Sequence, residues 1–266
     1  HRGIAKRFEG RSIADGVLVA ERVEGIASVA HALAYSHAVE SITGVTPPPR
    51  ARLIRVIHAE LERIANHLDV AMRLSDAAGL GVAIARFGLH KETTMRLVSQ
   101  LTGNRFARSV VVPGGVADGY DCDPHLVWQQ VARLAARIDA DRHTLMNDAT
   151  FIDRVRGTGR LAPELAHAHG ALGPVGRGSG VDNDVRRAFP YDGYTDLQTI
   201  EPAARDDGDA LARLRVRWAE ADSSVKLIQR ACVRLAMLTD QRTRVPVPPA
   251  DGYAVVLAES PQGDVL

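Results

Sequence analysis

One long stripe of apolar side chains most constrains what this sequence can fold into. The stripe steps by four, four, three, four and four residues through Leu53, Ile57, Leu61, Ile64, Leu68 and Met72. This spacing places all six side chains on one face of an amphipathic helix. Three prolines at 47–49 provide a rigid entry to it. Because the stripe is too long for one neighbour to cover, the sequence predicts a central helix over 48–76 in a helical bundle.

Four further segments have helical patterns. They lie near 26–43, 82–102, 124–147 and 209–238. Gly44 and Gly103 follow two of these segments as expected C-caps. Asp123 followed by Pro124 is a typical helix start, with a side-chain cap and a first-turn proline. The pattern therefore predicts at least five helices.

The remaining segments predict little β-structure. A short strand is expected within 109–116, where it breaks into a glycine turn, and another at 253–257. Residues 170–208 are rich in glycine, proline and aspartate, and a long loop preceded by a short helix is predicted there. The fold class is therefore mainly α, a helical bundle with a small β part, in one domain over 1–266.

Composition excludes several classes of protein. The 266 residues carry a net charge of +1, so no strongly basic surface indicates a nucleic-acid partner. No run of about 18 apolar residues could form a membrane span. Cys122 and Cys232 match no metal-binding spacing. Because the chain opens on His1 and ends at Leu266 within apparent strand sequence, we expect that it comes from a longer protein.

Glu60, Arg63 and His67 share one face of the predicted central helix, at positions i, i+3 and i+7. They could form an ion pair on a wet surface, and spacing alone favours this interpretation. They could instead form a polar network inside a helical core, which would suit proton movement. No HExxH motif is present, and the glycine-rich run at 176–180 fits neither dinucleotide-binding pattern.

Six stretches of the sequence together resemble one superfamily. They are residues 1–3, 21–40, 48–68, 101–116, 177–191 and 259–263. The second contains the run ERVEGIAS, the third contains ELERIANHL, and the fourth joins LTGNR to PGGV. The chain is similar to the D subunit of NADH:quinone oxidoreductase, or complex I, and to the large subunit of formate-hydrogenlyase-type hydrogenases. The resemblance implies a mainly α large-subunit fold that docks on a small iron–sulfur subunit.

The resemblance also bears on metal binding. In the hydrogenases, two cysteines in the ERVEGIAS region help to hold nickel, and a second pair lies near the C-terminus, which would fall beyond Leu266. Glu24 and Ala27 occupy the first two positions here. A carboxylate and a methyl group cannot replace two bridging thiolates at a soft metal site. We therefore expect no nickel and no cofactor bound by this chain itself.

Complex I subunits have also lost the nickel-binding cysteines, and the cavity left in place of the nickel site binds quinone. This sequence differs from complex I at two positions of that cavity. Gly25 stands where complex I has a quinone-binding tyrosine, and Ala107 where it has a histidine near the terminal cluster. Complex I has a carboxylate linked to proton coupling at a position that aligns near Ala77, and Asp76 is the neighbouring residue here. Arg2 matches an arginine that faces the iron–sulfur cluster of the partner.

From the resemblance we expect the site residues to surround one interior cavity. They are Arg2, Arg22, Glu24, His31, Glu60, Arg63 and His67, and Asp76 is a further candidate site residue beside the proton-coupling position. Glu24 is the expected proton-handling carboxylate, with Arg22 holding it ionised. The alternative is that Glu24 and Arg22 merely fill space as a pair.

The implied function is that of a catalytic-type subunit. Its cavity would bind quinone or a related acceptor, which receives electrons from the iron–sulfur cluster of a partner subunit. Such a subunit would lie peripherally on the cytoplasmic side of the inner membrane, with membrane subunits as indirect partners. Two alternatives are a non-catalytic scaffold that keeps only the partner interface, and a hydrogenase or formate-hydrogenlyase component with altered ligands.

Overall fold

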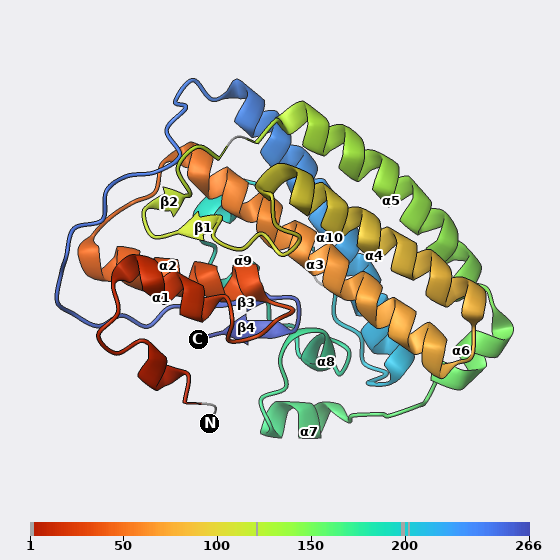
Figure 1. Ribbon diagram of the computed structural model, residues 1–266. Helices are drawn as coiled ribbons and strands as arrows, with labels where there is room; N and C mark the ends of the chain where they lie inside the picture. The colour runs from red at the N-terminus through yellow and green to blue at the C-terminus, as the bar shows by residue number, and fades with distance from the viewer. Residues whose placement is uncertain (1–2, 121, 198–199, 202) are drawn as a thin grey trace.

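Four long helices pack side by side and form the larger part of the molecule (Figure 1). The computed structural model describes residues 3–120, 122–197, 200–201 and 203–266. The long helices are α3 (Pro49–Ala77), α4 (Gly81–Thr102), α5 (Pro124–Met146) and α10 (Ala210–Met237). Helix α3 packs extensively on both α4 and α10, and α5 packs on α10 and α4. The predicted helical bundle with α3 at its centre is therefore confirmed.

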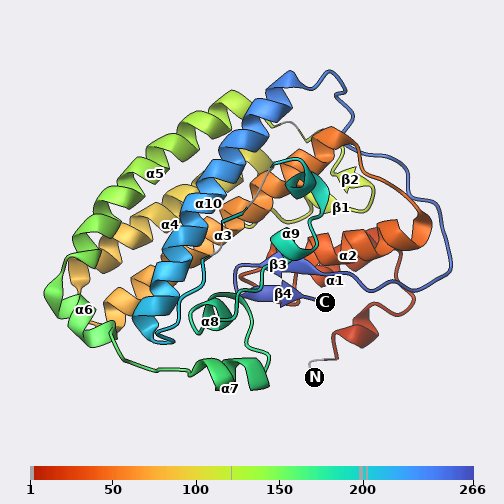
Figure 2. The same cartoon turned by 180° about the vertical axis from the view of Figure 1, so that it is seen from behind.

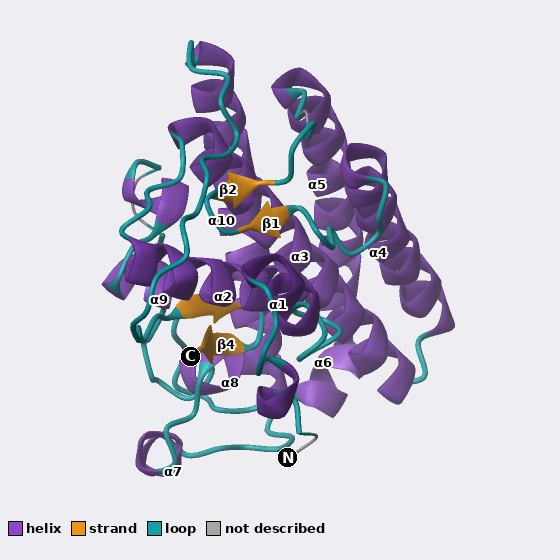
Figure 3. Ribbon diagram, turned by 60° about the vertical axis from the view of Figure 1, so that its left-hand side comes forward, coloured by secondary structure: helices purple, strands orange, loops and turns teal. Residues whose placement is uncertain are grey.

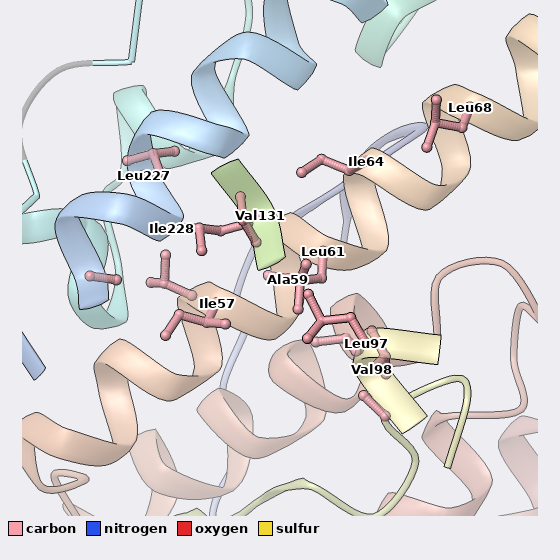
Figure 4. Close-up of a cluster of buried hydrophobic side chains, with 14 of the residues drawn as sticks. Ile57, Ala59, Leu61, Ile64, Leu68, Leu97, Val98, Val131, Leu227 and Ile228 are labelled. Carbon is pink, nitrogen blue, oxygen red and sulfur yellow. The ribbon is translucent and has the colours of Figure 1, made fainter. Parts of the chain in front are cut away.

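The apolar stripe of α3 forms the middle of the core. Leu61 and Ile64 are fully buried, as predicted. Figure 4 shows them among side chains from the neighbouring long helices, including Val98 of α4, Val131 of α5 and Ile228 of α10. Because branched side chains arrive from three helices, the stripe is covered along most of its length.

Two N-terminal helices and two small hairpins form a second layer against this bundle (Figure 3). The helices are α1 (Ile13–Ala20) and α2 (Ser28–Thr43). The first hairpin pairs β1 (Val111–Val112) with β2 (Gly115–Val116), and the second pairs β3 (Ala258–Ser260) with β4 (Gly263–Val265), both antiparallel. Helix α2 contacts both hairpins.

Arg55 joins this layer to the bundle from inside α3. Its guanidinium is fully buried and forms ion pairs with Glu40 of α2 and, at 3.2 Å, with Asp192. It also donates to the backbone carbonyl groups of Val112 and Gly115 in the first hairpin. One arginine therefore forms hydrogen bonds with α2, with the first hairpin and with Asp192, which fixes the position of the hairpin.

Several predicted details are confirmed. Gly44 and Gly103 end α2 and α4 in the left-handed conformation, at φ of 68° and 73°. Asp123 caps α5 by accepting from the backbone N–H groups of His125 and Leu126. The short strand and glycine turn within 109–116 are the β1–β2 hairpin.

Two predictions about irregular regions are wrong. Residues 253–257 form no strand, because Tyr253 is 94% exposed and its neighbours have no sheet to pack on; the strand begins at Ala258. Residues 170–208 contain three short helical segments, α8 (Gly173–Arg177), α9 (Val185–Ala188) and η2 (Asp192–Thr195). Helix α7 (Pro163–Ala168) is the short helix before them. In Figure 2, α8 and α9 lie beside the second hairpin, at the side of α10 and α3.

Two helices and a 3-10 segment were not predicted, namely α1, α6 (Ala149–Val155) and η1 (Ala5–Arg7). Helix α1 contains Gly16, which weakens a helical pattern. The glycine is needed for packing, since a Cβ there would lie 2.0 Å from the hydroxyl oxygen of Tyr35 on α2. No helix of the described residues is long and apolar enough to cross a membrane.

Replacing Leu61 by alanine is expected to lower the free energy of unfolding by about 2–5 kcal/mol, because it leaves a cavity in the covered stripe of α3. Val82→Ala is the control: Val82 is 81% exposed, and its replacement should change stability by less than about 0.5 kcal/mol. Denaturant titration measures both. Equal losses for the two variants would contradict a core centred on α3.

Candidate functional site

Glu60 and Arg63 form the start of a buried charge network, not a surface pair. Both side chains are fully buried, and Arg63 Nε lies 3.3 Å from Glu60 Oε2. Arg186 of α9 adds a second cation, with its Nη1 3.0 Å and 3.1 Å from the two carboxylate oxygens of Glu60. Ser224 and Tyr194 donate hydroxyl hydrogen bonds to the same carboxylate. The surface interpretation of this helix face is therefore wrong.

Charged groups from the segment 173–188 and the second hairpin extend the network. Arg177 Nε lies 2.7 Å from Glu220, and its Nη2 lies 3.1 Å from Glu259. Arg186 also pairs with Asp184 at 2.6 Å. We define the charge network as Glu60, Arg63, Arg177, Asp184, Arg186, Arg217, Glu220 and Glu259, together with His67. Its four acids balance its four arginines, so their burial leaves no net charge in the network.

His67 connects Glu220 to Arg217 within the network. Its Nε2 lies 2.8 Å from Glu220 Oε2, and its Nδ1 lies 3.0 Å from Arg217 Nη1. Because arginine only donates, Nδ1 accepts and Nε2 carries the proton given to Glu220. Burial lowers the pKa of His67 to about 4, which keeps the ring neutral. Burial opposes ionisation of Glu220, but the hydrogen bond from His67 and the charge of Arg177 hold its pKa well below its usual range.

The opposite side of α3 lines a cavity of about 200 Å³. Its other walls are the loop before α2, helix α4, and the loop after α4. Apolar side chains form much of the lining, and charged side chains join them. The lining residues are Gly25, Ile26, Val29, His58, Leu61, Glu62, Ala65, Asn66, Asp69, Arg73, Lys91, Met95, Val98, Arg105, Phe106 and Ala107. A hollow whose surface is largely apolar, with polar and charged side chains also in its lining, can hold a small molecule.

Four titratable groups of α3 line this cavity, namely His58, Glu62, Asp69 and Arg73, and burial shifts the pKa of the first two. The carboxylate of Glu62 accepts hydrogen bonds from the backbone N–H groups of Val29, at 2.7 Å, and Ala30, at 3.1 Å, at the start of α2. Burial raises the pKa of Glu62 to about 8. His58 is buried, its Nε2 contacts the hydroxyl of Tyr120, and burial lowers its pKa to about 4. Neither residue was predicted, because the polar face expected to matter was the one that carries Glu60.

The wall after α4 has an unusual backbone. Ala107 and Ser109 are left-handed, with φ of 49° and 61°. Such conformations of residues other than glycine cost on the order of 1–3 kcal/mol each and need support from their surroundings. The buried carboxylate of Glu21 supports this segment, because it accepts a hydrogen bond from the backbone N–H of Ser109. The wall that presents Phe106 to the cavity is therefore held in place by the residue that follows α1.

Glu24 and His31 lie together in a second depression, beside the second hairpin. Glu24 Oε2 is 3.7 Å from His31 Nε2, and the Glu24 side chain is 41% exposed. Gln262 lines the same depression, and its Nε2 donates to Asn66 Oδ1 at 2.9 Å. Because Asn66 lines the cavity on α3, one hydrogen bond joins the two hollows.

The predicted site residues therefore separate into groups. Glu60, Arg63 and His67 converge in the charge network, and Glu24 and His31 are neighbours outside it. Arg22 is exposed and donates to the backbone carbonyl of Leu18, so the expected pairing with Glu24 is wrong. Asp76 is exposed near the end of α3, roughly 24 Å along the helix from Glu60, so it does not share the cavity. Arg2 lies outside the described residues.

A solved structure shares this arrangement of helices. The chain superposes on a chain of the membrane-bound sulfane sulfur reductase, an archaeal respiratory membrane complex, with a TM-score of 0.85 and 28% identity, over 97% of this chain and 72% of that one. This chain therefore has the fold of a subunit of a respiratory membrane complex.

Sequence comparisons identify the family. Residues 80–260 match the family described as respiratory-chain NADH dehydrogenase, 49 Kd subunit, and residues 2–73 match nickel-dependent hydrogenase. The chain belongs to the family of the 49 kDa subunit of respiratory-chain NADH dehydrogenase, as the resemblance in its sequence indicated.

The individual relatives include both a hydrogenase and subunits of NADH-quinone oxidoreductase. The chain is 34% identical over 270 residues to the carbon monoxide-induced hydrogenase of Rhodospirillum rubrum, covering all of this chain and 74% of that protein. It is 35% identical over 254 residues to NADH-quinone oxidoreductase subunit 4 of Thermus thermophilus, covering 94% of this chain and 61% of that protein. The chain thus spans about three fifths to three quarters of these relatives.

The side chains at the hydrogenase cysteine positions do not fit nickel. Ala27 is fully buried and presents a methyl group, while Glu24 is partly exposed and beside His31. Within the described ranges, no group of three or more histidine, cysteine, aspartate or glutamate side chains is arranged to hold a metal ion. Neither Glu24 nor Ala27 offers a thiolate, the ligand that nickel needs at these two positions.

Replacing Arg63 by methionine is expected to cost about 3–5 kcal/mol of unfolding free energy, because Glu60 and Glu220 each lose a buried cation nearby. Arg96→Met provides the control, since Arg96 is 77% exposed and pairs with Glu92 on the surface of α4. Because this pair is on the surface, water and salt screen it, and its loss should change stability little. Denaturant titration should separate the variants, and similar small losses would show that the network does not stabilise the fold.

Proposed function

We propose that this chain is the catalytic-type subunit of a membrane-associated electron-transfer complex, and that the cavity beside Gly25 and Phe106 binds its electron acceptor. The acceptor is a quinone or a related molecule, and the electrons come from an iron–sulfur cluster in a small partner subunit. The observation that carries the proposal is the cavity itself, an apolar hollow with Glu62 and His58 in its lining.

The chemistry of the lining supports a flat, largely apolar ligand with polar oxygens. Ile26, Met95 and Phe106 offer apolar and aromatic surface, and Glu62 offers hydrogen-bonding capacity. Gly25 leaves room for such a ligand, because a Cβ there would meet no heavy atom within 4 Å. Relatives named NADH-quinone oxidoreductase favour quinone over other acceptors.

The remaining assignments follow from membership of the family. By its match to the family, Arg2 is the residue proposed to meet the partner's iron–sulfur cluster, and the chain is proposed to lie peripherally on the cytoplasmic side of the inner membrane, reaching the membrane subunits through its partners. Glu24 exchanges protons with His31 in the second depression, where the two side chains are 3.7 Å apart. Burial lowers the pKa of His31, while Glu24 opposes that effect.

Filling the cavity tests the proposed acceptor site. Gly25→Phe should raise the KM for quinone or lower turnover at least about tenfold in the assembled complex, because the new ring occupies the acceptor's space. Gly81→Phe is a matched control: a Cβ at Gly81 also meets nothing within 4 Å, but Gly81 lies at the start of α4 and does not line this cavity.

The outcomes separate the proposal from the scaffold alternative. Wild-type kinetics of an assembled Gly25→Phe complex would refute acceptor binding in this cavity. A wild-type complex that assembles but has no quinone-linked turnover would favour a scaffold.

A hydrogenase role is the second candidate, because residues 2–73 match nickel-dependent hydrogenase. We expect no stoichiometric nickel, since Glu24 and Ala27 replace thiolates. Elemental analysis after anaerobic purification checks this, and about one nickel per chain would overturn it.

Glu24→Gln in the intact complex tests the proton role of Glu24. Glutamine keeps the shape but loses the titratable proton, so turnover should fall by about 10²-fold or more if Glu24 handles a proton of the reaction. Assembly must be measured in parallel. Unchanged turnover with normal assembly would leave Glu24 as a space-filling residue.

A further inference from the structure

We propose that Glu62 is the acid that delivers a proton to the acceptor in the cavity. This inference rests on the proposed function, since it requires the acceptor to bind beside Gly25 and Phe106. It adds the residue that serves the chemistry there, which lies on the opposite side of α3 from the charge network.

Glu62 differs from the other carboxylate in the cavity lining, Asp69. Asp69 pairs with Lys91 and Arg73, each at 2.7 Å, so it is held as an ionised group. Within the described chain, Glu62 has no cation within 4 Å, and its hydrogen bonds come from the backbone N–H groups of Val29 and Ala30. A carboxyl group without a salt-bridge partner can exist in its neutral form and donate a proton.

The surroundings of Glu62 balance two opposing effects. Burial disfavours the carboxylate and raises the pKa, while the two N–H groups at the start of α2 favour the carboxylate. The result is a pKa of about 8, close to the range in which a group can both give up and regain a proton near neutral pH.

Charged groups from each neighbouring element also face this site. Arg63 lowers the pKa of Glu62, and Glu24, from the loop before α2, raises it. His58 is neutral near pH 7, because burial lowers its pKa to about 4. Despite partial burial, the ion pairs with Lys91 and Arg73 lower the pKa of Asp69, so the acid of this lining whose pKa is raised is Glu62. The other charged or titratable members of the lining are His58, Asp69, Arg73, Lys91 and Arg105.

The proton transfer can be written with full balance. The acceptor takes two electrons, one at a time, from the partner's iron–sulfur cluster, and two protons. The O–H bond of the Glu62 carboxyl group breaks as a new O–H bond forms on an acceptor oxygen. The negative charge left on Glu62 is held by the N–H groups of Val29 and Ala30. The second proton comes from solvent by way of the Glu24–His31 pair of the proposed function, and solvent restores the proton of Glu62.

This assignment separates Glu62 from Glu24. Glu24 lies in the second depression with His31, whereas Glu62 lines the cavity itself. The two carboxylates are therefore on different sides of the loop that precedes α2. The two are electrostatically linked, because the charge of Glu24 raises the pKa of Glu62, so Glu24→Gln is expected to move the alkaline fall in turnover to lower pH, whereas Glu62→Gln removes that fall.

The experiment measures quinone-linked turnover of the assembled complex between about pH 6 and 10. Wild-type kcat should fall as the pH rises through about 8, since the acid loses its proton there. Glu62→Gln should lower kcat by about 10²-fold or more and abolish that fall, with KM for the quinone little changed. Glu62→Asp keeps an acid and should retain part of the turnover and the alkaline fall.

Asp69→Asn is the matched control, because it removes a carboxylate from the same lining. It should keep the fall in kcat near pH 8, since Asp69 is an ion-paired group. Should Glu62→Gln fail to assemble, infrared spectroscopy of the wild-type complex and Glu62→Asp replaces it. The carbonyl band of a protonated carboxylic acid should disappear above about pH 8 and should shift in the aspartate variant.

The results distinguish this inference from the proposed function. A Glu62→Gln complex with wild-type kcat and pH profile overturns the role of Glu62, and so does reduced assembly with an unchanged pH profile per complex. If Gly25→Phe still blocks turnover in that case, the acceptor site stands without Glu62. If neither substitution has an effect, both proposals fail.

Discussion

The ion pairs between buried arginines and the acids of α3 and α10 hold the parts of this molecule together. Arg186 brings α9 onto Glu60, and Arg177 joins α8 to Glu220 and to the second hairpin through Glu259. Arg63 adds hydrogen bonds to the backbone carbonyl groups of Glu259 and Ser260. These contacts join a glycine-rich segment and a two-stranded hairpin to the long helices.

The two sides of α3 therefore have different physical characters. One side carries charges that are paired and fixed, with His67 kept neutral between Arg217 and Glu220. The other side carries an acid bound only by backbone N–H groups, next to open space. A rigid, fully paired scaffold on one face leaves the opposite face available for a group that changes its protonation state.

Periodicity predicted the long helices well, because the apolar positions of α3 and its neighbours repeat at helical spacing. It could not decide whether Glu60 and Arg63 were buried, since their partner Arg186 lies 126 residues from Glu60 in sequence. Glu62 was missed because its partners are backbone N–H groups, which leave no side-chain signal. The strand expected at 253–257 failed because β-propensity alone does not show whether a sheet is available. The pairing of Arg22 with Glu24 failed because two residues of separation in an irregular loop do not fix side-chain directions.

The equal number of acids and arginines in the charge network has an electrostatic consequence for redox chemistry. A neutral cluster exerts only a weak, dipolar field on a molecule bound across α3. Removing any one charge would turn it into a buried monopole, worth roughly 1–2 kcal/mol on a unit charge ~10 Å away at an effective dielectric constant of ~20. The reduction potential of the acceptor proposed to bind in the cavity would thus depend on the charge balance of side chains that do not line this cavity.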